Sequence, residues 1–270
     1  MVSRLCLPLT QSRTHFFSPS LSLSLSSLSH SSLSHHHRRS SLKMSTTSTT
    51  TTPELIEHFV LFKVKPNTSP SKITTMISSL AALSSLPQVA HITAGQILRT
   101  KSSPFPFTHL LHSRYSSKQN LDAYSAHPSH VTAVTDHVKP ICDDIMAVDW
   151  VSGGVSGAVS VRPGSAMRVT FLKLKGGATE DDRARVLDVI GGIKGVFPVI
   201  EQISFGENFS MGRAKGFEIG SVAVFPGLGE LEAMDSDAER AGLEKDKVRD
   251  LIESVIVLDY VVPEQQSASL

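Results

Sequence analysis

The chain has 270 residues, with 26 Lys and Arg against 25 Asp and Glu, and its sequence contains no run of about 18 apolar residues that could cross a membrane. Because the net charge is close to zero and no basic helix with interleaved aromatic residues appears, we expect neither nucleic acid nor a membrane as a partner. Only Cys6 and Cys142 are present, which excludes a disulfide framework and a cysteine metal site in the folded part.

Residues 1–53 have the composition of a targeting segment. They contain no Asp or Glu, carry a few Arg and Lys, and are dominated by Ser, Thr, Leu and His. This composition cannot bury enough apolar surface to fold and is typical of an organelle transit peptide. We expect a disordered or removed segment that directs the protein to the chloroplast if translation starts at Met1. The alternative is an extension ahead of a second start at Met44.

The rest of the chain contains one unit twice. The strand-like sequence that begins near Ile56 resembles the one at Ala166, and the segment that ends at Trp150 resembles the one that ends at Tyr260. Both matches have the same offset along the chain. Two matches in register at opposite ends of a unit indicate two copies of one domain, each about 100 residues long.

The first repeat begins with a strand over 58–65, in which aromatic and branched residues alternate with others. Apolar residues at spacings of three and four then predict an amphipathic helix over 71–86, with Ser69 as its cap and Pro70 in its first position. Two strands are expected next, over 89–98 and 109–115, joined by a loop with Pro104 and Pro106. A helical region over 117–142 follows, interrupted at Pro128 and Pro140, and a strand over 145–151 closes the repeat.

The second repeat follows the same order, with helices predicted over 179–190 and 239–254. Each unit therefore reads β-α-β-β-α-β, the split arrangement of ferredoxin-like folds. The predicted organisation is a first domain over 54–151, a linker over 152–165, a second domain over 166–263 and a tail over 264–270.

The predicted fold class is α+β, with two tandem ferredoxin-like βαββαβ domains. A four-stranded sheet with helices on one face leaves its other face bare, and two such faces can bury each other. We expect the two repeats to pair sheet to sheet within one chain. The alternative is a homodimer of the chain that forms two separate barrels.

Three segments resemble the plant family of stress-response dimeric α/β-barrel proteins. They are the strand over 58–65, the Tyr-x-x-His-Pro-x-His element from Tyr124 to His130, and the closing Val148-Asp149-Trp150. The resemblance is close over 54–151 and weaker over 166–263, and the tandem arrangement is similar to that of the family's peroxisomal member. It implies a dimeric α/β-barrel fold and a role in stress response, as a non-catalytic or small-ligand-binding module.

Polyketide cyclases that resemble this family imply an alternative, enzymatic function. They use a Tyr and a His as an acid/base pair to close a ring in a linear polyketide thioester, and Tyr124 and His130 match that pair. His58 and His109 match two further pocket histidines, and His127 lies within the same motif. An imidazole with a pKa of about 6.5 can take up a proton at neutral pH, and a phenol with a pKa of about 10 can donate a hydrogen bond to a developing enolate.

The same motif also has a packing interpretation. In an unbroken helix Tyr124 and His130 would lie about 240° apart around the axis, although Pro128 breaks the helix and can redirect His130. His127 and Pro128 can also form a turn that restarts the helix, with the histidines hydrogen-bonded to backbone.

The second repeat has lost the acid/base pair. At the offset between the repeats, Arg168 stands in the place of His58 and Arg240 in the place of His130. We therefore expect the second repeat to complete the barrel and any catalysis to lie in the first.

No cofactor is expected to be required. Some members of the family hold a magnesium-type ion through backbone carbonyls at the end of the first helix, and the matching residues are Leu80, Leu83, Ser84 and Leu86. Their side chains include no carboxylate, so such an ion would be held weakly.

The chain ends in Ala268-Ser269-Leu270, which resembles the Ser-Lys-Leu peroxisome signal. A polar tail precedes it, so we expect it to be accessible to the peroxisomal import receptor. If translation starts at Met44, the peroxisome is the expected location.

Overall fold

The computed structural model describes residues 55–152 and 158–264, all of which belong to one compact unit. The predicted targeting segment over 1–53 and the predicted signal at Ala268, Ser269 and Leu270 lie outside the described residues. None of the helices in the described part combines the length and the apolar character needed to cross a bilayer.

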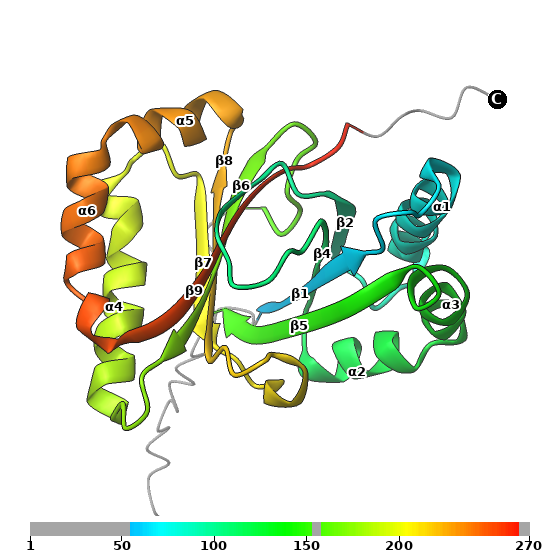
Figure 1. Ribbon diagram of the computed structural model, residues 1–270, viewed down its shortest axis with the longest axis horizontal. Helices are drawn as coiled ribbons and strands as arrows, with labels where there is room; N and C mark the ends of the chain where they lie inside the picture. The colour runs from blue at the N-terminus through cyan, green and yellow to red at the C-terminus, as the bar shows by residue number, and fades with distance from the viewer. Residues whose placement is uncertain (1–54, 153–157, 265–270) are drawn as a thin grey trace, which may run out of the picture. The chain divides into compact units, whose positions relative to one another are not determined.

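The first repeat forms a four-stranded antiparallel sheet covered by helices (Figure 1). The strand order is β2-β4-β1-β5, which is the ferredoxin-like order that the sequence predicts. Its elements are β1 (Leu55–Val64), α1 (Pro70–Ala81), a 3-10 turn (Ala82–Ser85), β2 (His91–Gln96), β3 (Arg99–Ser102), β4 (His109–Tyr115), α2 (Lys118–Ala126), α3 (Pro128–Thr132), a π turn (Ala133–Val138) and β5 (Cys142–Ser152).

The second repeat has the same order with one strand added at its edge. Its sheet runs β3-β9-β6-β8-β7, so a strand from the first repeat completes it. Its elements are β6 (Ala166–Leu174), α4 (Glu180–Val196), β7 (Gln202–Glu207), a 3-10 turn (Met211–Arg213), β8 (Ile219–Phe225), α5 (Leu228–Ser236), α6 (Ala238–Asp246), a 3-10 turn (Arg249–Leu251) and β9 (Ile252–Val261).

Local sequence accounts for the helix starts. Ser69 is in the N-cap position of α1 as predicted, although its side chain makes no capping hydrogen bond, and Pro70 is in the first turn, where its missing N–H costs nothing. Thr179 and Asp182 form a reciprocal capping box at the start of α4. Pro128 begins α3 after a break at His127, as the sequence indicates.

The helix predicted over 239–254 is wrong at its end. Helix α6 stops at Asp246, and Ile252 already begins strand β9. The helical region also begins earlier, with α5, and divides at Asp237, whose side chain accepts a hydrogen bond from the backbone N–H of Arg240 and so caps α6.

The loop predicted between the second and third strands of the first repeat contains the short strand β3. It pairs antiparallel with β9 of the second repeat, with Arg99 opposite Asp259. The corresponding loop of the second repeat reaches the first sheet, where Asn208 bridges to Trp150. Each repeat therefore extends the edge of the other repeat's sheet.

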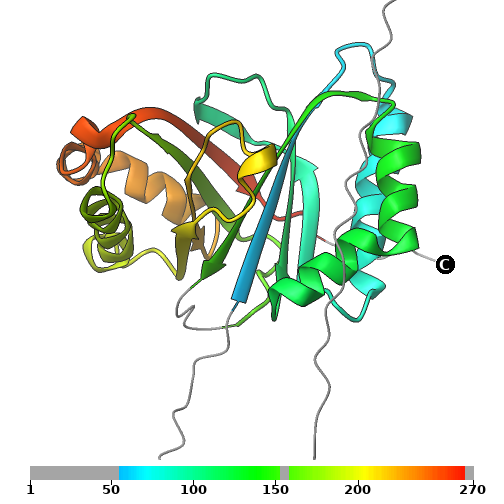
Figure 2. The same ribbon diagram turned by 90° about the horizontal axis from the view of Figure 1, so that it is seen from below.

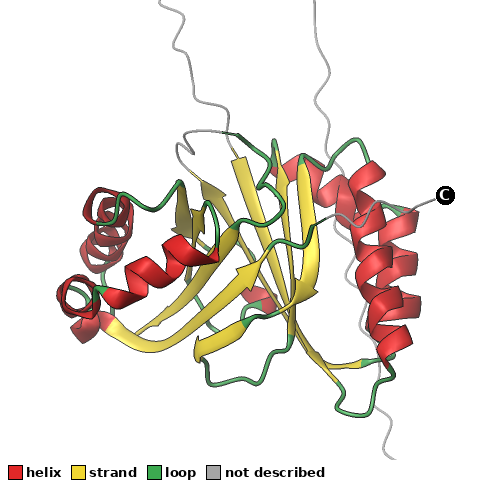
Figure 3. Cartoon of the chain, turned by 90° about the horizontal axis from the view of Figure 1, so that it is seen from above, coloured by secondary structure: helices red, strands yellow, loops and turns green. Residues whose placement is uncertain are grey.

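The bare faces of the two sheets share one core. Buried side chains from both repeats make up this cluster, among them Phe59, Trp150, Phe171 and Leu258. Figure 2 and Figure 3 show the strands in the middle and helices on both outer sides, and the colours of Figure 2 identify α1 to α3 on one side and α4 to α6 on the other. The core between helices and sheet is one cluster in the first repeat but two separate clusters in the second.

An aromatic residue of each repeat inserts against the other repeat. The indole Nε1 of Trp150 donates to Ser204 Oγ at 3.0 Å, and the hydroxyls of Tyr260 and Thr93 are hydrogen-bonded at 2.8 Å. Glycine makes room for the indole, since a Cβ on Gly220 would lie 2.5 Å from Trp150. Trp150 and Tyr260 occupy equivalent positions of the two repeats, so the two contacts follow the internal repeat of the sequence.

Candidate functional site

The residues predicted as an acid/base pair meet on the helix side of the first sheet. The ring centroids of Tyr124 and His130 are 4.6 Å apart, so the break at Pro128 does bring them together. Tyr115 at the end of β4 and His58 on β1 complete an aromatic group, with centroids 5.2 Å and 6.3 Å from that of Tyr124.

All four predicted site histidines already have hydrogen-bond partners. His58 Nδ1 bonds to a carboxylate oxygen of Asp149, and His130 Nδ1 bonds to the carbonyl of Ser125 at 2.9 Å. His127 accepts a hydrogen bond from the backbone N–H of Ser129 and thereby caps α3, as in the packing interpretation.

His109 lies apart from this group. It occupies the start of β4, at the other end of the strand from Tyr115, and its Nδ1 is 2.9 Å from Thr108 Oγ1.

Burial sets the protonation states of the pair. It raises the pKa of the Tyr124 phenol and lowers the pKa of the His130 imidazole, so both groups are neutral at pH 7. The side chain of Tyr124 is only 1% exposed, and buried residues such as Met76 and Leu121 fill the space around it. The arrangement can exchange a hydrogen bond, but the space beside it is occupied by side chains.

A buried charged cluster lies between the two sheets, and the sequence reasoning missed it. Glu57, His112 and Arg114 are fully buried, with His112 Nε2 at 2.6 Å and Arg114 Nε at 3.1 Å from Glu57. Arg114 Nη1 also donates to Gln202 of the second repeat at 3.1 Å. Burial alone would raise the pKa of Glu57, but Arg114 and His112 lower it to about 2. The sequence signal that could have revealed this cluster is that charged residues, Glu57 in β1 and Arg114 in β4, occupy strand positions that face the core.

The second repeat contains a cavity of about 690 Å³ between its helices and its sheet. Most of its lining is apolar and comes from α4, α5, α6 and the helix-facing strand residues, including Leu172, Ile190, Ile193, Phe197, Met234 and Val257. Sequence reasoning expected only a structural role for this half of the chain.

Smaller side chains account for the cavity. At the offset between the repeats, Ser221 stands in the place of Leu111, which is buried in the first repeat's core. Met234 stands in the place of Tyr124, which packs into the first repeat's core. These substitutions leave the second repeat's core divided around the cavity.

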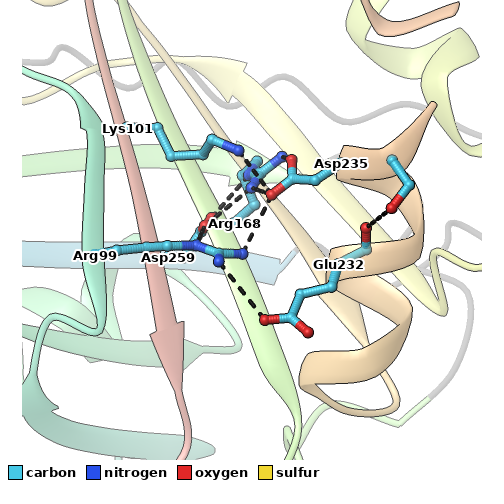
Figure 4. Close-up of polar contacts among 7 residues, drawn as sticks. Arg99, Lys101, Arg168, Glu232, Asp235 and Asp259 are labelled. Carbon is cyan, nitrogen blue, oxygen red and sulfur yellow. Dashed lines mark hydrogen bonds and ion pairs between the residues drawn. The ribbon is translucent and has the colours of Figure 1, made fainter. Parts of the chain in front are cut away.

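An ion-pair network lies at one end of this cavity, where Lys101, Arg168 and Asp235 line it (Figure 4). Arg168 Nη1 is 2.7 Å from Asp235, and Arg168 Nε is 2.7 Å from Asp259. Arg99 and Lys101 reach in from β3 of the first repeat and pair with Asp259 and Asp235 at 2.5 Å and 2.7 Å. Both repeats therefore build this end of the cavity.

Burial alone would raise the pKa of Asp235, but its bonds to Arg168 and Lys101 hold the pKa well below the usual value for Asp. Asp235 is therefore charged at pH 7.

The part of the chain that the structure describes contains no group of three or more His, Cys, Asp or Glu side chains placed to bind a metal ion. At the predicted backbone site, the carbonyls of Leu83 and Leu86 accept hydrogen bonds from the N–H groups of Leu86 and Val89 at 3.1 Å and 3.0 Å. A magnesium ion at Leu80, Leu83, Ser84 and Leu86 stays a prediction.

Residues 56–152 and 167–262 each match the family model of the stress responsive A/B barrel domain. The chain is 50% identical over 218 residues to a stress-response A/B barrel domain-containing protein of Arabidopsis thaliana, covering 80% of this chain and 82% of that protein. It is 41% identical over 211 residues to a second such protein of the same plant, DABB1, covering 77% of this chain and 97% of that protein. An anthrone oxidase-like protein of known structure is similar in fold, with a TM-score of 0.54 at 12% identity over 81% of this chain and 98% of that one.

Proposed function

The chain belongs to the stress responsive A/B barrel domain family and carries two copies of its domain, and on this premise we propose that it is a small-ligand-binding module. The observation that carries the proposal is the cavity of about 690 Å³ in the second repeat. Its volume and its apolar lining with a few polar groups are typical of small-molecule sites. The first repeat, whose equivalent space is filled by side chains, serves as the partner that completes the site.

The lining is mostly apolar and therefore favours a largely apolar ligand. The network at the end of the cavity contains three cations and three anions, which are Arg99, Lys101, Arg168, Glu232, Asp235 and Asp259. The guanidinium of Arg168 donates hydrogen bonds to the carboxylates of both Asp235 and Asp259. Because its charges are balanced and its donors are in use, the network offers little to an anionic group.

We propose that the two repeats stay paired within one chain in solution. The contacts of Trp150 with Ser204 and of Tyr260 with Thr93, together with the pairing of β3 with β9, support this arrangement. The alternative homodimer would use the same contacts between two chains. Sedimentation that gives the mass of a monomer at all concentrations would favour pairing within the chain.

The second candidate function is the cyclase-like enzyme with Tyr124 and His130 as acid/base pair. The contact between the two rings supports it. A substrate would require α2 and α3 to move away from the sheet, because Tyr124 is buried among packed side chains. Ring closure of a linear polyketide thioester that is lost in Tyr124→Phe would support this candidate over the binding module.

The experiment that tests the binding module is a fluorescence titration of the full chain with N-phenylnaphthylamine, an apolar dye that brightens in an apolar site. We expect saturable binding that Ala241→Leu abolishes, because the added side chain fills the cavity. The matched control is Ala233→Leu, the same exchange at an exposed position of α5. Equal binding by the two variants would place the dye elsewhere and refute the proposed site.

We further propose that the ending Ala268-Ser269-Leu270 directs the protein to peroxisomes through the import receptor. A fluorescent protein fused ahead of this chain should accumulate in peroxisomes and become diffuse when these three residues are removed. A second fusion that starts at Met1 and carries the fluorescent protein behind the chain would support the transit-peptide interpretation of residues 1–53 if it accumulated in chloroplasts.

A further inference from the structure

Two hydroxyl groups lie side by side on the wall of the second repeat's cavity. Thr170 on β6 and Ser221 on β8 are directly opposite each other in the sheet, and both line the cavity. Directly opposed residues of antiparallel strands have Cβ atoms about 5 Å apart, so one atom between them can reach both side chains. Ser221 is 8% exposed.

Neither hydroxyl is used by the part of the protein that the structure describes. The hydrogen bonds among the described residues include none from the side chain of Thr170 or Ser221, whereas the hydroxyls of Ser204 and Thr93 each have a partner. Neither hydroxyl oxygen is among the described side-chain atoms that are fully buried without a partner, so both face the open space of the cavity and are available to a ligand atom there.

The fold itself does not require these hydroxyls. The equivalent positions of the first repeat are Val60 and Leu111, which pack in the apolar core between its helices and sheet. The same sheet positions are therefore apolar where the space is filled and polar where a cavity is open.

We propose that the ligand carries an uncharged oxygen, a carbonyl or a hydroxyl, that binds Thr170 and Ser221 while the rest of the molecule fills the apolar cavity. This rests on the proposed function, because it specifies the ligand of that same cavity. A carbonyl oxygen has two lone pairs and accepts from both hydroxyls, and an alcohol both donates and accepts.

The position of the pair separates it from the ionic end of the cavity. Thr170 lies two residues along β6 from Arg168, on the same face of the strand and next to Leu172. The oxygen is thus bound in the apolar part of the cavity, where a carboxylate would be buried without a counter-ion. An aromatic or aliphatic ketone or alcohol fits, and a plain hydrocarbon leaves both hydroxyls unpaired.

The experiment compares benzophenone with diphenylmethane, two compounds of the same carbon skeleton that differ in the central carbonyl. Each displaces N-phenylnaphthylamine from the full chain, and the affinities are compared in wild type and in the double variant Thr170→Val/Ser221→Ala. The valine is the residue of the first repeat, so the fold tolerates it. Thr100→Val, the same exchange at an exposed strand position, is the control.

We expect wild type to bind benzophenone more tightly than diphenylmethane, by roughly fivefold for each hydrogen bond made. The preference should disappear in the double variant and persist in Thr100→Val. Tight binding of both compounds, with equal affinity in wild type, would refute the role of the two hydroxyls and leave the cavity intact. If neither compound nor the dye binds, the proposed function fails and this inference fails with it.

Discussion

A methyl group added at Gly220 should disrupt the packing between the two repeats. Gly220 lies on β8 of the second repeat, and a Cβ there would meet Trp150 of the first repeat at 2.5 Å and 2.6 Å. Real Cβ atoms do not approach other heavy atoms so closely, so the indole or the strand must shift. Trp150 is fully buried and stacks on Phe59 with centroids 5.3 Å apart, which leaves it little space to move.

Overpacking of this kind costs about 1–3 kcal/mol. For a folded region of this size, Gly220→Ala should therefore lower the melting temperature by roughly 2–4 °C for each kcal/mol lost. Urea unfolding followed by fluorescence is a direct assay, because Trp150 is the only tryptophan in the sequence.

Gly192→Ala provides a control of opposite sign. Gly192 lies within α4, and no atom lies within 4 Å of the position that a methyl group would take, so alanine should stabilise the protein by about 0.5–1 kcal/mol. In a Trp150→Leu background, followed by circular dichroism, the cost of Gly220→Ala should largely vanish. A Gly220→Ala variant as stable as wild type would contradict the packing of Trp150 against the second repeat.

The remaining predictions concern the buried charges and the first repeat. Asp259→Asn breaks a buried ion pair and should destabilise the protein by about 3 kcal/mol in urea unfolding. Asp250→Asn, which breaks an exposed pair, is the control and should cost less than about 0.5 kcal/mol. Similar costs for the two variants would refute the role of burial. Burial is the main cause that lowers the pKa of His91 from 6.5 to about 3, so the folded state keeps this ring neutral. The contribution of His91 to the free energy of unfolding should therefore be at its maximum above pH 6.5 and should decrease as the pH drops toward 3. His91→Phe should flatten that fall by up to about 1.4 kcal/mol per pH unit, and an unchanged slope in acid titrations would contradict the assignment. Tyr124→Phe and His130→Ala should leave dye affinity within about twofold of wild type, since they lie in the other repeat; a loss of binding would move the site to the first repeat.

The sequence was sufficient to predict the order of strands and helices in each repeat. The constant offset between the repeats and the alternation at 58–65 are visible in the residues themselves, and the starts of α1 and α3 follow from the local chemistry of Pro70 and Pro128. Strand β3 could not be predicted in this way. Its residues are polar, and they become a strand only by pairing with β9, which lies at the far end of the other repeat.

The contact between Tyr124 and His130 was within reach of the sequence, because Pro128 indicates the break that redirects His130. The cavity was missed for a different reason. It results from the loss of side-chain volume at Ser221 and Met234, and each of these exchanges is common by itself. Only the comparison of each position with its equivalent in the first repeat shows that both face the same space.

Light-induced labelling with benzophenone tests the central claim, that an apolar ligand enters the second repeat's cavity. When irradiated, this ketone bonds covalently to nearby C–H groups, and peptide mass spectrometry locates the adducts. We predict labelling of cavity residues, Met234 above all, and its loss in Ala241→Leu. Labelling confined to the exposed Met211 or to Met76 in the first repeat's core would contradict the account.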